Sequence, residues 1–255
     1  MTTTTLGVRR ADSGRLHTRL SWLDSHHSFS FGHHWDQDNT HFGLLLVNND
    51  DVIAPGTGFD THPHRDMEIV TWVLRGQLVH QDSEGHNGVI YPGLAQRMSA
   101  GRGILHSEKN DAWKLLGGTE HDDPVHLVQM WVVPDEARID PGYEQLEIAD
   151  ELLRGRLAPV ASGMARHDGA SGIRIRQRDA ALHAARLAAG DEVTLPDAPY
   201  VHLFVPRGTV TLEGAGELAT GDAVRIAGNG GQRVVAGQDG AEILVWEMHS
   251  TITAN

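Results

Sequence analysis

The chain has 255 residues, of which 40% are hydrophobic and 22% charged, enough apolar material for the core of one large or two modest domains. Its 34 acidic residues outnumber 21 lysines and arginines, and a formal charge of −13 without any basic run excludes an electrostatic grip on nucleic acid. The lack of cysteine excludes disulfides and thiol chemistry, and no apolar run suits a signal core or a membrane span, so we expect a cytoplasmic protein.

Short segments with alternating apolar and polar residues follow one another along the chain. They lie at 41–56, 68–82, 88–93 and 125–134 in the first half, and at 185–196, 200–214, 217–228, 233–237 and 241–248 in the second. Glycine, proline, asparagine and aspartate bound most of them, which is typical of strands joined by tight turns. Residues 143–153 fit either one helix or a strand and a turn. The pattern predicts an all-β sandwich or barrel.

The two halves of the chain resemble each other. Residues 71–82 align with 202–213 through a shared strand, Arg-Gly turn and strand, and residues 90–101 then align with 217–228. This repeat favours two copies of one β-barrel module over a single large sandwich. The division that we expect is an N-terminal domain at 1–135, a connection at 136–164 and a C-terminal domain at 165–255.

Histidine is frequent and is concentrated in the first half, where 13 of the 17 precede residue 135. His62 and His64 are two residues apart, so on a strand both side chains leave the same face, although two surface histidines would have the same spacing. His106 and Glu108 form a second pair of this kind. On neighbouring strands, the two pairs would bring three nitrogens and one oxygen to one iron(II) or manganese(II) ion and leave positions open for substrate or dioxygen.

Glu68 competes with Glu108 for the carboxylate role. It follows His64 by four residues, an even offset, so on a regular strand its side chain would also face the metal. Three roles stay open for Glu68: a further ligand, a partner that orients an imidazole, or a general base.

Two stretches of the first half resemble the signature of the pirin family, a bicupin branch of the cupin superfamily. They are "THPHRDMEIVTWVLRGQLVHQDSEG" at 61–85 and "YPGLAQRMSAGRGILHSE" at 91–108, and "SHHSFSFGHHWD" at 25–36 is similar to the family's segment upstream. The resemblance implies an all-β fold of two tandem cupin (jelly-roll β-barrel) domains. Asp66 and Met67 depart from the glycine and aromatic residue of the common family motif, which leaves the choice of substrate open.

The resemblance also implies a metal site and an activity. It implies that one divalent transition metal, iron(II) first, with manganese, nickel, cobalt, copper or zinc as alternatives, is held by His62, His64, His106 and Glu108. Some bacterial pirins resemble quercetin 2,3-dioxygenases, which open the ring of a flavonol with dioxygen. By that resemblance, Glu108 or Glu68 would accept the proton of the flavonol hydroxyl.

Two other hypotheses stay open. Pirins are also described as redox-responsive partners of other proteins, so this chain could be a metal-binding regulatory module that recognises a protein partner without turnover. It could also be a metal-free structural protein with incidental histidines. None of the three hypotheses involves direct contact with nucleic acid or with a membrane.

Several aromatic and basic residues near the two pairs are candidates for a substrate pocket: Phe29, Phe31, His33, Trp35, Arg65 and Arg102. Structural or turn roles are the alternative for the histidine-rich segment that contains the first four. Either arginine would steer an anionic substrate or pair with a nearby carboxylate. Trp72 and Trp131 lie in strand patterns, which predicts core positions for both.

The second copy of the module offers an internal control. The alignment places Thr194, Pro196 and Tyr200 opposite His62, His64 and Glu68, and it places Val234 and Ala236 opposite His106 and Glu108. None of these residues could replace the ligand that it faces. We therefore expect the C-terminal domain to keep the fold without the metal ligands.

Overall fold

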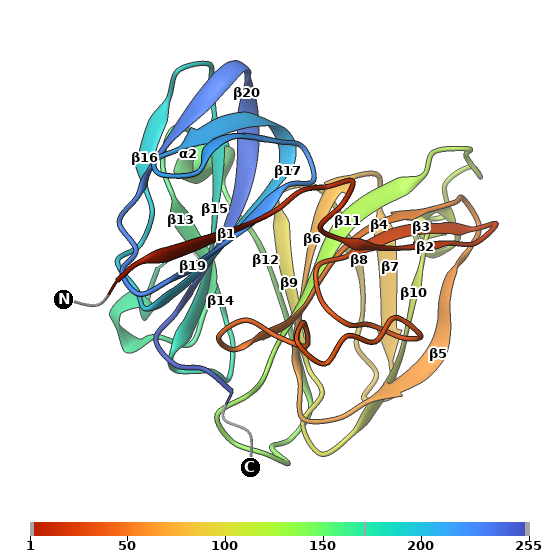
Figure 1. The fold of residues 1–255 in the computed structure, drawn as a ribbon. Helices are drawn as coiled ribbons and strands as arrows, with labels where there is room; N and C mark the ends of the chain where they lie inside the picture. The colour runs from red at the N-terminus through yellow and green to blue at the C-terminus, as the bar shows by residue number, and fades with distance from the viewer. Residues whose placement is uncertain (1–2, 171, 253–255) are drawn as a thin grey trace.

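A computed structural model describes residues 3–170 and 172–252 of the chain. Two β-barrel domains lie side by side, the N-terminal one mainly in orange to green and the C-terminal one in cyan to blue (Figure 1). Strands dominate both domains, as the alternating sequence pattern predicts. No helix among the described residues is long and apolar enough to cross a membrane.

The N-terminal barrel consists of two antiparallel sheets. The seven-stranded sheet has the order β12 (Gly142–Glu147), β9 (Leu94–Ser99), β6 (Glu68–Arg75), β11 (Val125–Val132), β4 (Leu45–Ile53), β3 (Leu23–His27) and β2 (Leu16–Arg19). The four-stranded sheet has the order β5 (Gly58–His64), β10 (Ile104–Lys109), β7 (Leu78–Asp82) and β8 (Asn87–Ile90). A short helix, α1 (Ala112–Leu116), lies between β10 and β11 along the chain.

The C-terminal barrel is one nine-stranded sheet that bends around its own core. The main path is β1 (Thr5–Arg9), β19 (Ala223–Ala227), β17 (Tyr200–Leu212), β20 (Arg233–Met248), β15 (Ala180–Leu187), β13 (Ala158–Ser162) and β14 (Ile173–Arg174). Off this path, β16 (Glu192–Thr194) pairs with β20, and β18 (Gly216–Ala219) pairs with β17. Two short helical segments precede β15: α2 (Asp150–Leu153) and the 3-10 helix η1 (Ala165–His167).

The two domains share one plan of strand pairing, as the sequence repeat predicts. In the first, β6 pairs with β9 and β11, while β10 pairs with β5 and β7. In the second, the long strand β17 pairs with β18, β19 and β20, and β20 also pairs with β15 and β16. Thus β17 takes the places of β6 and β7, and β20 takes those of β10 and β11. Gly76 and Gly208 occupy the same point of this plan and both have a φ of 78°, a conformation open to glycine.

The strand pairing differs from the expected domain division at both ends of the first domain. Strand β1 lies within the expected N-terminal domain but pairs with β19 of the C-terminal sheet, as the red strand in Figure 1 shows. The expected connection at 136–164 contains β12, which pairs with β9, and β13, which pairs with β15. Each exchanged strand adds a hydrogen-bonded neighbour to an edge that would otherwise stay open. Residues 1–2 and 253–255, the outer limits of the expected domains, lie outside the described residues.

A shared hydrophobic core joins the two barrels. It contains buried residues of both domains, among them Trp72 and Met130 from the first and Phe204 and Trp246 from the second. Trp72 Nε1 donates a 2.8 Å hydrogen bond to Glu242 Oε1 across the interface, which satisfies the indole N–H inside the core. Trp72 is therefore a core residue, as its strand pattern predicts.

Phe29 also belongs to this shared core and is 1% exposed. The guanidinium carbon of Arg225, from the C-terminal domain, lies 4.3 Å from the centroid of the Phe29 ring. Arg225 also donates a 2.8 Å hydrogen bond to the carbonyl oxygen of Ser28. The expectation that Phe29 lines a substrate pocket is therefore wrong, because the chain after β3 turns this ring toward the other domain.

Candidate metal centre

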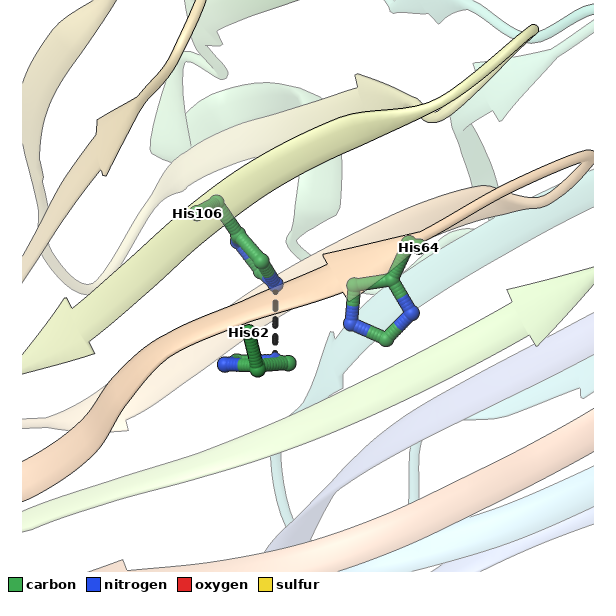
Figure 2. Close-up of side chains that lie close together, drawn as sticks. All are labelled: His62, His64 and His106. Atoms are coloured by element: carbon green, nitrogen blue, oxygen red, sulfur yellow. Dashed lines mark hydrogen bonds between the residues drawn. The ribbon is translucent and has the colours of Figure 1, made fainter.

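The pairing of β5, β10 and β7 brings the predicted ligands onto one face. On β10, His106 lies opposite His62 of β5 and opposite Asp82 of β7, while Glu108 lies opposite His80. Because residues opposite each other and residues two apart share a face, all these side chains point the same way. Figure 2 shows the rings of His62, His64 and His106 turned toward one another. One ligand atom from each ring lies within 4.8 Å of the other two.

Contacts behind two of the rings fix the nitrogen that faces the group. His62 Nδ1 lies 2.7 Å from the carbonyl oxygen of Asp60, which can only accept, so Nδ1 carries the proton and Nε2 is bare. His80 Nε2 lies 3.2 Å from Asp82 Oδ2 and donates to that carboxylate. His80 Nδ1 is therefore bare and faces His106 Nδ1 at 3.5 Å, so His80 lies against the back of the His106 ring.

Asp82 is ionised in this arrangement. Burial raises the pKa of its carboxyl, but hydrogen bonds from the His86 backbone and from the His80 and His86 rings outweigh burial and lower the pKa. The Asp82 carboxylate therefore accepts the His80 proton and does not compete for it. The chain from Asp82 through His80 to His106 thus sets the orientation of a predicted metal ligand.

His62 Nε2 and His106 Nε2 face each other at 3.0 Å, and the bare His62 Nε2 accepts a hydrogen bond from His106 Nε2 (Figure 2, dashed line). A metal ion bound by both rings would take the place of the proton between them. Two nitrogens bound at right angles to one metal ion, each at about 2.1 Å, are also about 3.0 Å apart. The spacing of the two rings therefore fits adjacent ligands of one metal ion.

His64 supplies the third nitrogen. Its Nε2 is buried and has no hydrogen-bond partner among the residues that the structure describes. Burial and the neighbouring imidazoles lower the pKa of His64 to about 4 and that of His106 to about 3, so both rings are neutral at neutral pH. Neutral imidazoles with bare nitrogens are the form that binds a divalent transition metal, so the residues present fit such an ion.

Glu108 lies beside His106 on the same face but does not join the group of His62, His64 and His106. It groups with His80 and His106, and both of its carboxylate oxygens accept from Gln129 Nε2, at 2.9 and 2.8 Å. A register shift between His106 and Glu108 in the pairing with β5 accompanies this displacement. The three histidines therefore form one group, and Glu108 as their fourth partner stays a prediction.

Glu68 is not in this group. It begins β6 in the other sheet, is fully buried, and its Oε2 accepts a 2.9 Å hydrogen bond from the backbone N–H of Arg176 in the C-terminal domain. Burial raises the pKa of Glu68. The even offset from His64 does not put both side chains on one face, because Asp66, with a φ of 50°, interrupts the strand between them. The structure thus gives Glu68 a place between the domains, and the expectation that it faces the metal is wrong.

Among the aromatic pocket candidates, Phe31 alone adjoins the histidine group. Its ring meets that of Trp131 edge-on at a centroid distance of 5.5 Å, and Trp131 meets His64 in the same manner at 4.8 Å. Trp131 is half-buried and packs against the small apolar cluster that contains Ile69 and Met98, so it lies at the edge of the core and not within it. His33 is exposed, and Trp35 is 77% exposed, so neither lines the site.

The two arginine candidates lie on the surface. Arg102 pairs with Asp140, and Arg65 Nε lies 3.8 Å from Asp66 Oδ2, so both make the carboxylate contacts that were the alternative to substrate steering. Arg65 also lines an open surface depression of about 500 Å³ that includes His64. The other lining residues are Pro63, Ser83, Gly103, Ile104 and Leu105.

Sequence reasoning missed four residues that surround the group: His80, Asp82, Gln129 and Trp131. A signal was present for all four. His80 and Asp82 are two residues apart in one strand, as are Gln129 and Trp131, which is the same spacing that identified His62 with His64. Without the register between strands, nothing in the sequence indicated that these pairs face the same interior.

Comparison with known proteins covers both domains. Residues 9–132 match the model of the family described as pirin. Residues 160–248 match the model described as quercetinase C-terminal cupin domain. The two matches identify both barrels as cupin domains, in agreement with the fold that the sequence predicts.

Three individual proteins are similar over different lengths. A Mycobacterium tuberculosis protein with a provisional quercetin 2,3-dioxygenase name is 58% identical over 250 residues, 98% of each chain. The Escherichia coli K12 protein named quercetin 2,3-dioxygenase is 48% identical over 138 residues, 54% of this chain and 56% of its own. The crystal structure of the bacterial pirin YhhW from Escherichia coli in complex with nickel(II) has a TM-score of 0.83 at 34% identity and covers 97% of this chain and 100% of its own.

Proposed function

This chain belongs to the pirin family, and on that premise we propose that it is a metal-dependent dioxygenase of the quercetin 2,3-dioxygenase type. Such an enzyme opens the ring of a flavonol with dioxygen. The observation that carries the proposal is the group of three imidazoles, with His62 Nε2 and His106 Nε2 3.0 Å apart. The names of the relatives supply the substrate class.

The metal would be held by His62, His64 and His106, with Glu108 completing the set. When bound, a divalent transition metal supplies a Lewis acid with open positions at which flavonol and dioxygen can meet. We take iron(II) as the physiological ion. The crystal structure of the relative YhhW in complex with nickel(II) supports a divalent ion.

Glu108 is the residue that would accept the proton of the flavonol hydroxyl. Its carboxylate is buried, lies beside His106 and is held by Gln129, whose Oε1 in turn accepts a 3.0 Å hydrogen bond from Trp131 Nε1. Because Gln129 only donates to Glu108, the carboxylate keeps lone pairs for a substrate proton. Gln129 thus orients the base, and Trp131 orients Gln129.

The aromatic rings beside the group suit a flat aromatic substrate. Trp131 contacts His64 with its ring and Gln129 with its N–H, and Phe31 packs on its far side. A planar flavonol stacks on such rings with little loss of conformational freedom. Phe31 and Trp131 would therefore position the substrate and exclude water from the hydroxyl whose proton Glu108 accepts.

The test is aerobic turnover of quercetin, followed as loss of flavonol absorbance, by protein loaded in turn with iron(II), manganese(II), nickel(II), cobalt(II) or copper(II). We expect turnover with at least one of these ions. Protein that holds one equivalent of metal at the histidine group and turns over no flavonol with any of them would contradict the proposal. That result would favour the regulatory module.

Glu108→Gln separates the two roles of the carboxylate. If Glu108 is the base, the variant keeps its metal and loses about 10²- to 10⁴-fold in kcat. If the variant also loses the metal, Glu108 is a ligand. Unchanged kcat with unchanged metal content would remove Glu108 from the mechanism.

A further inference from the structure

A second group of potential ligands lies in the C-terminal domain. One ligand atom each from His167, His183 and Glu247 lies within 4.8 Å of the other two, and we name these three residues the C-terminal group. None of them is at a position that the sequence repeat aligns with His62, His64 or His106. The group is therefore separate from the metal centre of the first barrel.

The C-terminal group continues the inner face of its own barrel. His183 is on β15 and Glu247 on β20, two strands that pair with Ala181 opposite Glu247. The alternate residues Ala185 and Val245 on these faces lie in the apolar core of the barrel. His183 and Glu247 thus lie where that core ends. His167, at the end of η1, lies over them, with its ring centroid 5.5 Å from that of His183.

A side-chain cation already bridges the group. Arg166 Nε donates to His167 Nε2 at 3.4 Å, and Arg166 Nη2 donates to Glu247 Oε1. A guanidinium only donates, so His167 Nε2 carries a bare lone pair. His167 Nδ1 then donates its proton to Ser162 Oγ at 2.9 Å. The Arg166 side chain is 51% exposed and can swing into solvent.

Glu247 is a buried carboxylate at the centre of these contacts. Its side chain is 4% exposed and accepts from His183 Nε2 at 3.1 Å and from His249 Nε2 at 2.7 Å. Burial alone would raise the pKa of Glu247, but the hydrogen bonds from His183, Arg166 and His249 lower it to about 2. The group therefore holds a permanent negative charge, which requires a cation nearby.

We propose that His167, His183 and Glu247 form a second metal site, which binds zinc(II), and that Arg166 occupies the cation position when zinc is absent. Imidazole nitrogens and a carboxylate oxygen are the ligands that zinc prefers, and three protein ligands suffice for a site completed by water or by His249. Ligands at about 2.1 Å in a tetrahedron are about 3.4 Å apart. The 3.1 Å between His183 Nε2 and Glu247 Oε2 is close to this spacing.

Zinc binding requires two rearrangements in the group. Arg166 leaves, and the His183 proton moves from Nε2 to Nδ1, which frees the Nε2 lone pair for the metal. Zinc then links η1, β15 and β20 through one ion, which stabilises the C-terminal barrel by ligand linkage. A network held by Arg166 alone would show none of these properties.

The test uses the full chain with His62→Ala and His106→Ala, so that the first centre is disabled. Titration calorimetry with zinc chloride is expected to show one equivalent bound. Thermal unfolding is expected to show a higher Tm with zinc than without it. Adding His183→Gln or His167→Ala weakens binding by more than about tenfold, as loss of a ligand should. Adding Arg166→Gln strengthens binding, because a competing cation is removed. The control His121→Ala changes neither the zinc affinity nor the Tm.

Three outcomes would overturn the proposal: no zinc bound in this background, binding that ignores His183→Gln and His167→Ala, or binding that weakens with Arg166→Gln. The last variant keeps the test decisive if His183→Gln fails to fold. Arg166 is on the surface, and its removal strengthens zinc binding only if the guanidinium competes for the metal position.

Discussion

In the N-terminal barrel, the paired strands β5 and β10 carry His62 opposite His106, whereas the paired strands β16 and β20 of the C-terminal barrel carry Val193 opposite Val234. Both pairs occupy the same place in a shared plan. Val193 and Val234 lie in a continuous apolar core, while the histidines line a polar interior with Glu108 and Gln129. The compared positions of the second barrel carry apolar side chains that pack together. In the first barrel, the polar side chains of the candidate metal centre replace this packing.

The comparison teaches where this fold tolerates polar groups. In the first barrel, His62 and His106 have a contact behind the ring, to the Asp60 carbonyl oxygen and to the pair of His80 and Asp82, while His64 Nε2 has no hydrogen-bond partner among the described residues. In the second barrel, the polar group of His183 and Glu247 lies where the apolar core ends. Four variants break or sharpen this contrast, and the largest effect comes first.

The double change His62→Ala with His106→Ala should abolish flavonol turnover and leave the fold intact. The two rings contribute ligands and little apolar burial, and the shared core and the second barrel stay unchanged. Turnover and circular dichroism, compared with a control that combines His33→Ala and His121→Ala, give the measurement. Global unfolding would instead identify the metal as a structural requirement.

The reverse change places a histidine in the apolar barrel. Val234→His buries an imidazole at a position that is 0% exposed, and we expect a loss of about 2–6 kcal/mol in the free energy of unfolding from overpacking and an unpaired polar group. Val235→His, one residue further on the opposite face and half-buried, is the control and should cost far less. Denaturant unfolding compares them. Equal costs would mean that the interior of the second barrel is not selectively apolar.

His80→Ala tests the chain of contacts behind His106. Without His80 Nδ1, the His106 ring loses the acceptor that its Nδ1 proton needs when Nε2 binds the metal, and metal affinity should fall about 10- to 100-fold. His86→Ala is the matched control, because His86 also bonds Asp82 but does not contact His106. Competition with a metal chelator measures both. An equal loss in the two variants would assign the effect to Asp82 or to general packing.

His202 gives the smallest effect and a defined pH dependence. Burial, and then the charge of Arg225, lower the pKa of His202 from 6.5 to about 3, and neither ring nitrogen has a hydrogen-bond partner within the described part of the chain. Between about pH 6.5 and pH 3 the unfolded chain binds a proton that the folded chain does not, so stability falls as the pH falls through this window. Above pH 6.5 this difference in proton binding between the unfolded and folded chain vanishes.

His202→Leu removes the pH-dependent loss of stability that His202 causes. The stability of the variant should fall less steeply below pH 6.5, by about 1.4 kcal/mol per pH unit, which is the contribution of one proton. Chemical denaturation at pH 7, 6 and 5 gives the slopes. An unchanged slope would mean that His202 meets solvent in the folded protein.

The spacing of residues along single strands was predictable from the sequence. Pairs such as His62 with His64 and His106 with Glu108 share a face because side chains alternate along a strand. The positions of the second barrel that align with the ligands carry no imidazole or carboxylate, and the alignment of the two repeats predicted this. The repeat aligned Thr194 with His62, whereas the observed register pairs Val193 with Val234, a shift of one residue that leaves the apolar interior unchanged.

Contacts between strands and between domains were not predictable. Glu68 has the right spacing, yet the positive φ of Asp66 separates it from β5, and Arg176 of the other domain binds it. Phe29 and Phe31 are two residues apart, yet one enters the shared core and the other meets Trp131. Gln129, which donates to Glu108, is 21 residues away in the sequence, and the packing of one sheet against the other brings the two side chains together. Each of these contacts depends on tertiary packing, which the periodicity of a single strand does not predict.

Metal content measured side by side tests the central claim most directly. Elemental analysis is made on wild-type protein and on the His62→Ala with His106→Ala variant, both purified without a metal-affinity step. The account predicts that the wild type holds one equivalent of divalent transition metal more than the variant, whatever the C-terminal group binds. Equal metal content in the two proteins would contradict the assignment of these histidines as ligands and, with it, the proposed enzyme.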